Sequence, residues 1–279
     1  MTAKNILEDN ELFIIDLDGV VYEGNIAIVN AVESINKLHS YGKEIAYFTN
    51  NATLTPESYK NKLEGMGILT EGSQIYTSAM VCARSLRNAY KKGGTVFVVG
   101  EDGLVNALTD VGFSTLNVKY EFDEIIKNKT IKADFVAAGL DRSINYKKLA
   151  AASLLISRGA KFYASNTDAT LPDPSGFLPG AGSIVAFLAT ASGTNPEKIF
   201  GKPYPEGIQQ ILKAFSCHKN KAVIIGDRLD TDILCGKNAK INTAIVLTGV
   251  TQKKDVRNLS PEKMPDYVLN DLSDIFLNK

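Results

Sequence analysis

The chain of 279 residues is predicted to fold as an α/β protein built on a doubly wound parallel sheet. Short apolar runs alternate along it with segments of helical periodicity, which is typical of βαβ units. Within the runs the apolar residues are consecutive, as in strands buried on both faces of a parallel sheet. The length exceeds that of a usual single domain, so one large or two smaller domains are expected.

The elements follow one another in a regular order. The first predicted strand covers residues 12–15 and precedes a helix over 28–41, whose apolar residues recur at helical spacing. A strand over 45–48 comes next, then a helix over 56–66 with Thr55 as its N-cap and proline at its first position. The later predicted strands are 95–99, 135–138, 161–164, 198–200, 222–225, 244–247 and 267–269.

The middle of the chain is predicted to form a domain of its own. It makes a separate βα alternation, and glycine-rich or proline-containing breaks at 91–94 and 192–196 lie near its edges. We therefore expect residues 1–82 and 194–279 to form a core and residues 83–193 to form an inserted α/β domain, since insertions leave from exposed loops.

Composition excludes several classes of protein. The 31 basic and 31 acidic residues balance, so no global field favours nucleic acid or an anionic membrane. The N-terminus lacks the apolar core of a signal peptide, and no apolar run reaches the roughly 20 residues that span a bilayer. The three cysteines, Cys82, Cys217 and Cys235, lack CxxC spacing, and His39 and His218 lie far apart, so neither a disulfide framework nor a zinc site is expected. The expectation is a cytoplasmic protein.

Polar residues that carry chemistry follow four of the apolar runs. Because strand side chains alternate, Asp16 and Asp18 project to the same side after the first strand, and Gly19 permits a tight turn. The carboxyl ends of parallel strands are where open α/β sheets bind ligands. The sites at such ends are Asp16 with Asp18, Thr49 with Asn50 and Asn51, Lys202, and Asp227.

These residue types suit phosphoryl transfer, which needs charge neutralisation and an aligned nucleophile. Asp16 can attack phosphorus to form an aspartyl-phosphate, while Asp18 protonates the leaving alkoxide and then activates water. Asp16 and Asp227 would repel a phosphate unless a divalent cation joined them, and all-oxygen ligation favours Mg²⁺. Thr49 and Lys202 would hold the remaining phosphate oxygens.

The ordered motifs resemble a known family. Asp16-x-Asp18-Gly-Val-Val, Phe48-Thr-Asn-Asn51, Gly201-Lys202-Pro203 and Gly226-Asp227-x-x-x-Thr-Asp232 are similar to the four motifs of the haloacid-dehalogenase (HAD) superfamily. The resemblance is strongest to its subfamily IIA, the p-nitrophenylphosphatase, phosphoglycolate-phosphatase and NagD-like enzymes. It covers nearly the whole chain, because the insertion between the second and third motifs matches the α/β cap (C2 type) of this branch.

The resemblance implies a Rossmann-like core and a role for each motif residue. By the resemblance, Asp16 is the nucleophile and Asp18 the general acid and base. Thr49 and Lys202 bind the phosphate, and Asp227 binds magnesium. The family's second aspartate also binds the metal, through its main-chain carbonyl.

Further residues take roles from the same resemblance. Asp232 would orient metal-bound water, and Asn50 and Asn51 would join Thr49 at the phosphate. In the cap, Asn166, Asp168 and the 171–178 loop would contact the leaving group. Family members often form homodimers through the cap, so a homodimer is the expected assembly.

The predicted function is that of a magnesium-dependent phosphomonoesterase acting on a small phosphorylated metabolite. Phosphoglycolate, glycerol phosphate, pyridoxal phosphate and nucleoside monophosphates are the family's possibilities. A phosphomutase would keep the aspartyl-phosphate, but mutases on this scaffold have a smaller helical cap. A receiver-like signalling module accepts phosphate on aspartate, but it needs neither Asp18 nor a cap.

Arg228 and Asp230 are predicted to form a structural ion pair.

Overall fold

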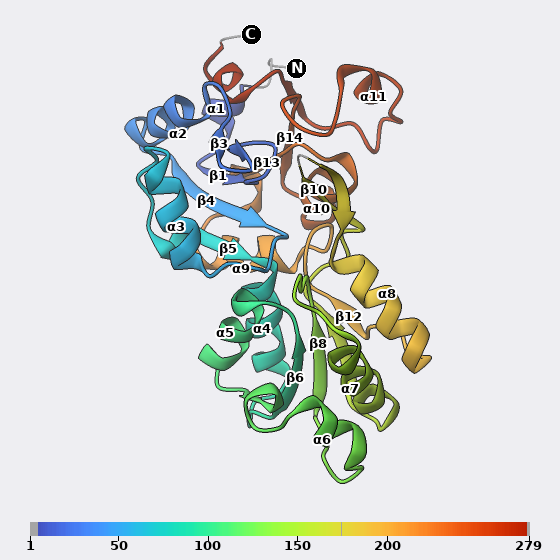
Figure 1. Ribbon diagram of the computed structural model, residues 1–279. Helices are drawn as coiled ribbons and strands as arrows, with labels where there is room; N and C mark the ends of the chain where they lie inside the picture. The colour runs from blue at the N-terminus through green and yellow to red at the C-terminus, as the bar shows by residue number, and fades with distance from the viewer. Residues whose placement is uncertain (1–4, 174, 278–279) are drawn as a thin grey trace. The chain divides into compact units, whose positions relative to one another are not determined.

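The computed structural model describes residues 5–173 and 175–277, which form two compact units. The first unit comprises residues 5–49, 56–76 and 202–277, and the second unit comprises residues 50–55 and 77–201. Figure 1 shows each unit as a parallel sheet with helices packed against it. Among the described residues, no helix is long and apolar enough to cross a membrane.

The first unit is built on a six-stranded sheet in the order β15-β14-β13-β1-β4-β5. If the six strands are renumbered 1 to 6 in chain order, their order in the sheet is 6-5-4-1-2-3. Counted from the opposite edge this is 3-2-1-4-5-6, the order of a doubly wound sheet. The pairs β1–β13, β1–β4, β13–β14 and β14–β15 are parallel. The bounds are β1 Leu12–Ile15, β4 Glu44–Thr49, β5 Ile75–Thr77, β13 Ala222–Gly226, β14 Asn242–Val246 and β15 Tyr267–Leu269.

Helices cover both faces of this sheet because the chain leaves its centre in opposite directions before and after the insertion. Right-handed crossovers then place α2 and α3 on one face and α9 and α10, which contact each other, on the opposite face. Glycines allow the close packing: a Cβ on Gly207 would lie 2.2 Å from the Phe48 ring. The bounds are α1 Ile6–Asp9, α2 Ala31–Ser40, α3 Pro56–Gly65, α9 Glu206–Ala214, α10 Leu234–Ala239 and α11 Lys253–Arg257.

The second unit contains a five-stranded sheet in the order β12-β9-β8-β6-β7, with every neighbouring pair parallel. Numbered by chain order it runs 5-4-3-1-2, the other common doubly wound order. The bounds are β6 Thr95–Val99, β7 Ser114–Thr115, β8 Phe135–Ala138, β9 Lys161–Ala164 and β12 Lys198–Ile199.

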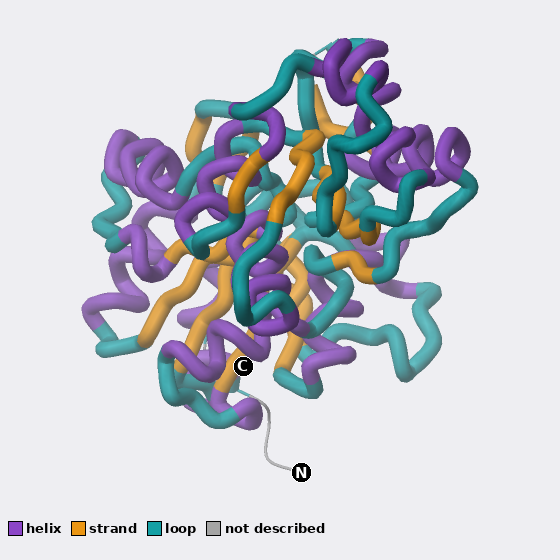
Figure 2. The backbone as a smooth tube through the Cα atoms, turned by 90° about the horizontal axis from the view of Figure 1, so that it is seen from below, coloured by secondary structure: helices purple, strands orange, loops and turns teal. Residues whose placement is uncertain are grey.

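The helices of the second unit form a layer on each side of its sheet. Figure 1 shows α4 and α5 on one side and α6, α7 and α8 on the other. Figure 2 shows the helices and strands of the whole chain from below. The second layer shares a continuous core with the sheet, in which Phe97, Val136 and Phe162 are fully buried. The bounds are α4 Ser78–Ala89, α5 Asp102–Asp110, α6 Phe122–Lys127, α7 Tyr146–Ser157 and α8 Ala181–Ser192.

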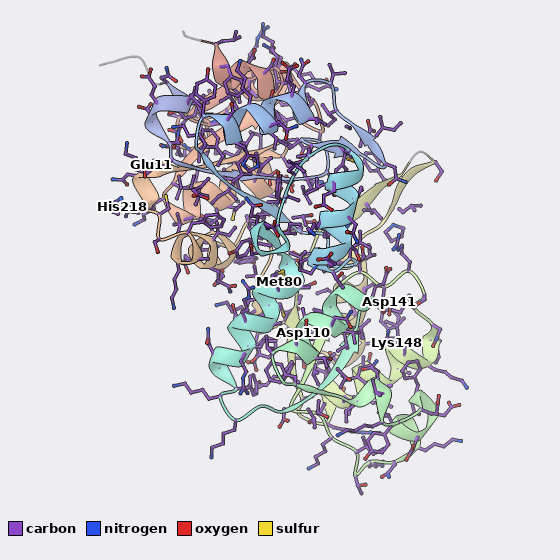
Figure 3. The ribbon with its side chains drawn as sticks, turned by 90° about the vertical axis from the view of Figure 1, so that its left-hand side faces the viewer. Glu11, Met80, Asp110, Asp141, Lys148 and His218 are labelled. Atoms are coloured by element: carbon purple, nitrogen blue, oxygen red, sulfur yellow. The ribbon has the colours of Figure 1, made fainter. Side chains whose placement is uncertain are left out.

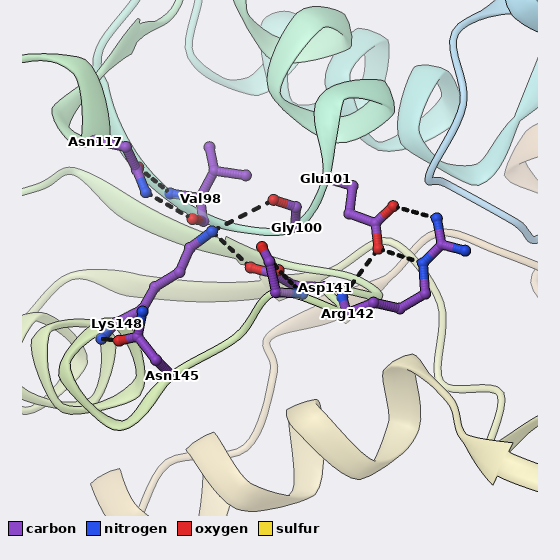
Figure 4. A network of polar contacts seen from close by, with 9 residues as sticks. Val98, Gly100, Glu101, Asn117, Asp141, Arg142, Asn145 and Lys148 are labelled. Carbon is purple, nitrogen blue, oxygen red and sulfur yellow. Dashed lines mark hydrogen bonds and ion pairs between the residues drawn. The ribbon is translucent and has the colours of Figure 1, made fainter.

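Ion pairs join the carboxyl ends of two central strands in the second unit. Lys148 Nζ lies 2.6 Å from the buried Asp141 carboxylate, and Figure 3 shows the two side chains together. The Arg142 guanidinium donates two hydrogen bonds to Glu101, at 2.8 and 2.7 Å. Figure 4 shows that this network also includes Asn117, which bonds the backbone of Val98 in both directions. The two ion pairs brace the loops after β6 and β8.

The predicted helices and apolar strands are present, and 12–15, 95–99, 135–138, 161–164 and 267–269 have the predicted bounds. The prediction missed the short strands β5 and β7 because two or three residues are too few to show a period. It also missed two hairpins, of which the second follows β9. Their strands are β2 Tyr22–Glu23 with β3 Ile26–Ala27, and β10 Thr170–Asp173 with β11 Gly176–Pro179.

The two compact units divide the chain at other positions than the predicted domains, 1–82 with 194–279 and 83–193. Residues 77–82 and 194–201 belong to the second unit, because α4 packs on α5 and β12 pairs with β9. Residues 50–55 also belong there: Gly103 N donates to Thr53 O at 3.0 Å. The chain therefore passes between the units four times.

Candidate active site

The site of the first unit lies at the reversal of strand order between β1 and β13. These strands pair in register, with Ile15 opposite Ile225, and Asp16 N extends the ladder by donating to Ile225 O at 2.9 Å. Asp16 follows the end of β1, and Asp227 follows the end of β13. Two carboxylates therefore meet at the position where doubly wound sheets bind ligands.

Lys202 is the central cation of this site. Its ammonium lies 2.7 Å from Asp16 Oδ1 and 2.6 Å from Asp232 Oδ1, and it donates to the Phe48 carbonyl at 3.0 Å. Lys202 is only 3% exposed. A buried ammonium is tolerated only when its charge is paired, and here two carboxylates and a main-chain carbonyl surround it. Lys202 thereby joins three strand ends, since Phe48 lies in β4 immediately before Thr49, which is itself buried.

Asp227 is held by backbone rather than by side chains. Val250 N donates to its Oδ2 at 2.8 Å, and Thr251 N donates to its main-chain carbonyl at 3.1 Å. Two glycines allow this approach: a Cβ on Gly19 would lie 2.5 Å from Asp227 Oδ2, and a Cβ on Gly249 would lie 2.1 Å from it. Gly19 also has φ +79°, a conformation that favours glycine.

Asp232 lies in the π-helical turn Leu229–Ile233 and is fully buried. Arg228 N donates to its Oδ2 at 3.1 Å, which closes the turn around the carboxylate. A Cβ on Gly226 would lie 2.1 Å from Asp232 Cγ, so this glycine is required for the carboxylate to sit against β13. The predicted ion pair between Arg228 and Asp230 is confirmed, with hydrogen bonds of 3.2 and 3.1 Å.

The site carries an excess of negative charge. Ligand oxygens of Asp16, Asp227 and Asp232 all lie within 4.8 Å of one another, and all three residues are buried. The Lys202 ammonium pairs with two of these carboxylates, so the three negative charges exceed its one positive charge by two. Burial raises the pKa of Asp16 well above its ordinary value, with Lys202 opposing and Asp232 and Asp227 adding to the increase.

The same imbalance acts on the neighbouring groups. Burial, and then the charge of Asp232, raise the pKa of Asp227 to about 6, although the Val250 N–H opposes this. Burial works against the charged form of Lys202, but the carboxylates of Asp16 and Asp232 outweigh it and raise its pKa.

A divalent cation fits this donor set. Carboxylate oxygens are the ligands that hard divalent cations prefer, and two positive charges would balance the two uncompensated negative ones. The cluster consists of the carboxylates of Asp16, Asp227 and Asp232, whereas the metal ligands predicted from the sequence are Asp16, Asp18 and Asp227. The carboxylate of Asp18 is not part of it.

Asp18 occupies a different environment from Asp16. Its side chain is exposed, and its backbone forms a β-bridge with Tyr22 in the turn after β1. Although solvent reaches Asp18, the dense packing around it raises the pKa of its carboxyl, and the ammonium groups of Lys62 and Lys202 oppose this. An accessible carboxyl with a raised pKa is suited to proton exchange.

The other predicted site residues belong to the second unit. Asn50 Nδ2 donates to Asp168 Oδ1 at 3.0 Å, and the buried Asn166 donates from Nδ2 to Asn50 O at 2.8 Å. Asn51 Oδ1 accepts from the backbone and hydroxyl of Thr53, at 3.1 and 2.8 Å. Asn166 and Asp168 therefore hold the segment that follows Thr49.

The prediction missed the loop after β14, which supplies the main-chain support of the site. Thr248 Oγ1 donates to Gly19 O at 2.7 Å, and the next two residues contact Asp227 as described above. A signal was present in the sequence, since Thr248-Gly249 follows an apolar run directly, as the other site residues do. No side chain of catalytic type marks this loop.

Comparisons with known proteins agree with this geometry. Models of haloacid dehalogenase-like and HAD-hydrolase-like families match residues 13–114 and 199–275, respectively. An acid sugar phosphatase of Staphylococcus saprophyticus is 35% identical over 96% of this chain and 98% of its own. The 4-nitrophenylphosphatase of Thermotoga maritima has a TM-score of 0.87 at 30% identity, covering 98% of both chains.

A third relative has been solved with metal ions. The glycerol phosphate phosphatase of Mycobacterium tuberculosis, in complex with magnesium, has a TM-score of 0.87 at 32% identity, covering 98% of this chain and 78% of that one. The same protein was also solved in complex with calcium.

A doubly wound sheet with aspartates and a buried lysine at its strand reversal defines the class, and the chain belongs to the haloacid dehalogenase-like hydrolases. Within them it is a phosphatase of subfamily IIA, the branch of the p-nitrophenylphosphatases.

Proposed function

We propose that the protein hydrolyses the phosphate monoester of a small metabolite through an aspartyl-phosphate on Asp16. The observation that carries this proposal is the cluster of Asp16, Asp227 and Asp232 around one buried ammonium at the strand reversal. Three carboxylates alone would repel a phosphate. Together with a cation they form a site in which an oxyanion is neutralised and a carboxylate nucleophile is held in line.

Asp16 is the proposed nucleophile because its carboxylate is buried and fixed. Lys202, at 2.7 Å, holds one oxygen of Asp16 and leaves the other to attack phosphorus. The new bond joins this oxygen to phosphorus while the bond from phosphorus to the alcohol oxygen breaks. Lys202, Thr49 and the backbone donors of Asn50 and Asn51 would hold the phosphate oxygens.

Asp18 is the proposed general acid and base. In its neutral form it gives a proton to the departing alkoxide, and the raised pKa of its carboxyl favours that form. As a carboxylate it then takes a proton from the water that attacks the aspartyl-phosphate. Inorganic phosphate leaves, and Asp16 returns to its starting state.

A divalent cation, which we propose to be Mg²⁺, would be held by the carboxylates of Asp16 and Asp227 and by the main-chain carbonyl of Asp18. When bound, it would neutralise phosphate charge that the Lys202 ammonium alone cannot. Asp232 would orient water bound to the cation. Its contact with Lys202 at 2.6 Å adds a second role, the positioning of that ammonium.

The proposed substrate is a small phosphate monoester such as a sugar phosphate, glycerol phosphate or phosphoglycolate. The names of the relatives support this class, since they are an acid sugar phosphatase, a 4-nitrophenylphosphatase and a glycerol phosphate phosphatase. We assign selection of the leaving group to the second unit, as a cap, with Asn166, Asp168 and residues 171–178 as the candidates. The hydrogen bond of Asn166 to Asn50 supports a positioning role for this residue as well.

The test is phosphate release from a panel of small monoesters, with Mg²⁺ and with excess chelator. We expect turnover that requires the metal, and we expect Asp16→Asn to lower kcat by at least about a thousandfold. The matched control is Asp230→Asn, an exposed carboxylate paired with Arg228, which should stay within about twofold of wild type. Turnover by a folded Asp16→Asn variant at the wild-type rate would refute the nucleophile.

Three predictions concern the context of the enzyme: its assembly, its partners and its location. A homodimer formed through the second unit would give twice the chain mass by light scattering, and a monomeric mass would contradict it. The balanced net charge supports the absence of nucleic-acid and membrane partners. A cytoplasmic location can be checked by cell fractionation.

A further inference from the structure

Lys62 is a cation beside the proposed general acid to which no role has yet been assigned. It lies in α3, and its ammonium sits 3.5 Å from the centroid of the Tyr22 ring. The side chain is half-buried, whereas Tyr22 is 1% exposed. A buried ring is a fixed platform, so this cation–π contact orients the ammonium and holds it in place.

The platform is tied to the turn that carries Asp18. Gly19 N donates to Tyr22 O at 2.9 Å, and Tyr22 N donates to Leu17 O at 3.2 Å. Asp18 and Tyr22 also form a β-bridge. The backbone thus sets where the Tyr22 ring lies relative to Asp18, and the ring in turn sets where the Lys62 ammonium lies. The position of this cation follows from the catalytic turn rather than from α3 alone.

The ammonium of Lys62 has capacity to bind an anion. Within residues 5–173 and 175–277 it forms no ion pair or hydrogen bond, so no protein acceptor occupies its three N–H donors. Lys60, two residues earlier in the same helix, instead lies between Glu57 and Glu64, at 3.9 and 3.6 Å. Burial lowers the pKa of Lys62, and the negative charge of Asp18 opposes this, so the two charges interact without forming an ion pair.

We propose that Lys62 is a specificity-determining residue that binds an anionic group carried by the substrate's leaving group, one or two carbons from the ester oxygen. The inference rests on the proposed function, because it takes Asp18 to be the acid that protonates that oxygen. The ester oxygen must come within about 3 Å of Asp18 for proton transfer. The leaving group then begins beside Asp18, and a carboxylate or second phosphate near its start is within the field of Lys62.

The experiment compares two substrates of similar size, 2-phosphoglycolate and 2-hydroxyethyl phosphate. 2-Phosphoglycolate carries a carboxylate where 2-hydroxyethyl phosphate carries a neutral hydroxymethyl group. The measured quantity is the ratio of their kcat/KM values. We expect Lys62→Met to lower this ratio at least about tenfold, since hydrogen bonds to charged groups contribute strongly to binding. Methionine keeps the apolar stem on the Tyr22 ring. Lys62→Arg should retain most of the ratio, and Lys60→Met should leave it unchanged.

A further substrate, which carries a second phosphate in place of the carboxylate, distinguishes the two kinds of anion. If Lys62 binds either kind of anion, Lys62→Met should lower the kcat/KM of glycerol bisphosphate relative to that of glycerol phosphate by about tenfold as well. An effect confined to phosphoglycolate would narrow the anion that Lys62 binds to carboxylates. If Lys62→Met lowers kcat equally for all substrates, or changes no ratio, the proposal is wrong. If methionine prevents folding, Lys62→Gln gives the same comparison. Failure of the proposed function is distinguishable, because the wild-type protein would then release phosphate from no ester.

Discussion

Removing the ammonium of Lys202 should destabilise the fold as well as abolish catalysis. In Lys202→Met the carboxylates of Asp16 and Asp232 lose partners at 2.7 and 2.6 Å, and the Phe48 carbonyl loses a donor at 3.0 Å. Removing one partner of a buried ion pair costs about 3–5 kcal/mol, because the remaining charge stays buried and uncompensated. For a domain of this size, each 1 kcal/mol lowers Tm by about 2–4 °C. The expected decrease is therefore about 6–20 °C.

The assay is thermal unfolding of the chelator-treated protein at neutral pH. The matched control is Lys237→Met, which removes an ammonium 3.4 Å from Asp266 in a partly exposed pair of the same unit. Pairs of that kind contribute about 0–1 kcal/mol, so this Tm should fall by no more than about 4 °C. A Lys202→Met variant that melts within about 2 °C of wild type would refute the charge accounting of the site.

Two further predictions concern Asp227. Its folded pKa of about 6 lies above the ordinary 3.8, so the native state binds the proton more tightly than the unfolded state. The metal-free protein should therefore lose stability, by up to about 3 kcal/mol, as pH rises from about 4 to about 6; a flat profile in denaturant titrations with chelator would contradict this. Gly249→Ala places a Cβ 2.1 Å from Asp227 Oδ2 and should lower kcat at least about tenfold. Gly65→Ala, whose Cβ meets nothing within 4 Å, should retain activity, and equal activity of the two variants would disprove the steric argument.

Much of the fold was predictable because each buried parallel strand corresponds to a short apolar run in the sequence. The strands 95–99 and 135–138 were found with their bounds because β-branched and apolar residues fill them and polar residues end them. The sheet order was not predictable in this way. Which strands become neighbours depends on packing across the whole sheet, and the short β5 and β7 carry no period of their own.

The boundary between the units shows the same limit. Residues 50–55 follow a strand of the first unit without a break in composition, yet they belong to the second unit. Hydrogen bonds to residues far along the chain decide this: Ser78 Oγ donates to Asn50 O at 2.6 Å, and Asn166 donates to the same carbonyl at 2.8 Å. Such contacts leave no signal in the local sequence.

In the active site, the sequence by itself determined which side chains stand at strand ends. Asp16, Lys202 and Asp227 could be named as candidates because a residue type and its place after an apolar run are both local properties. Only the tertiary structure decided how their charges combine. The pairing of Lys202 with Asp232, and the backbone that holds Asp227, join residues distant in the chain, and main-chain N–H groups are the same in every residue except proline. Electrostatic balance depends on distances, and distances exist only once the chain has folded.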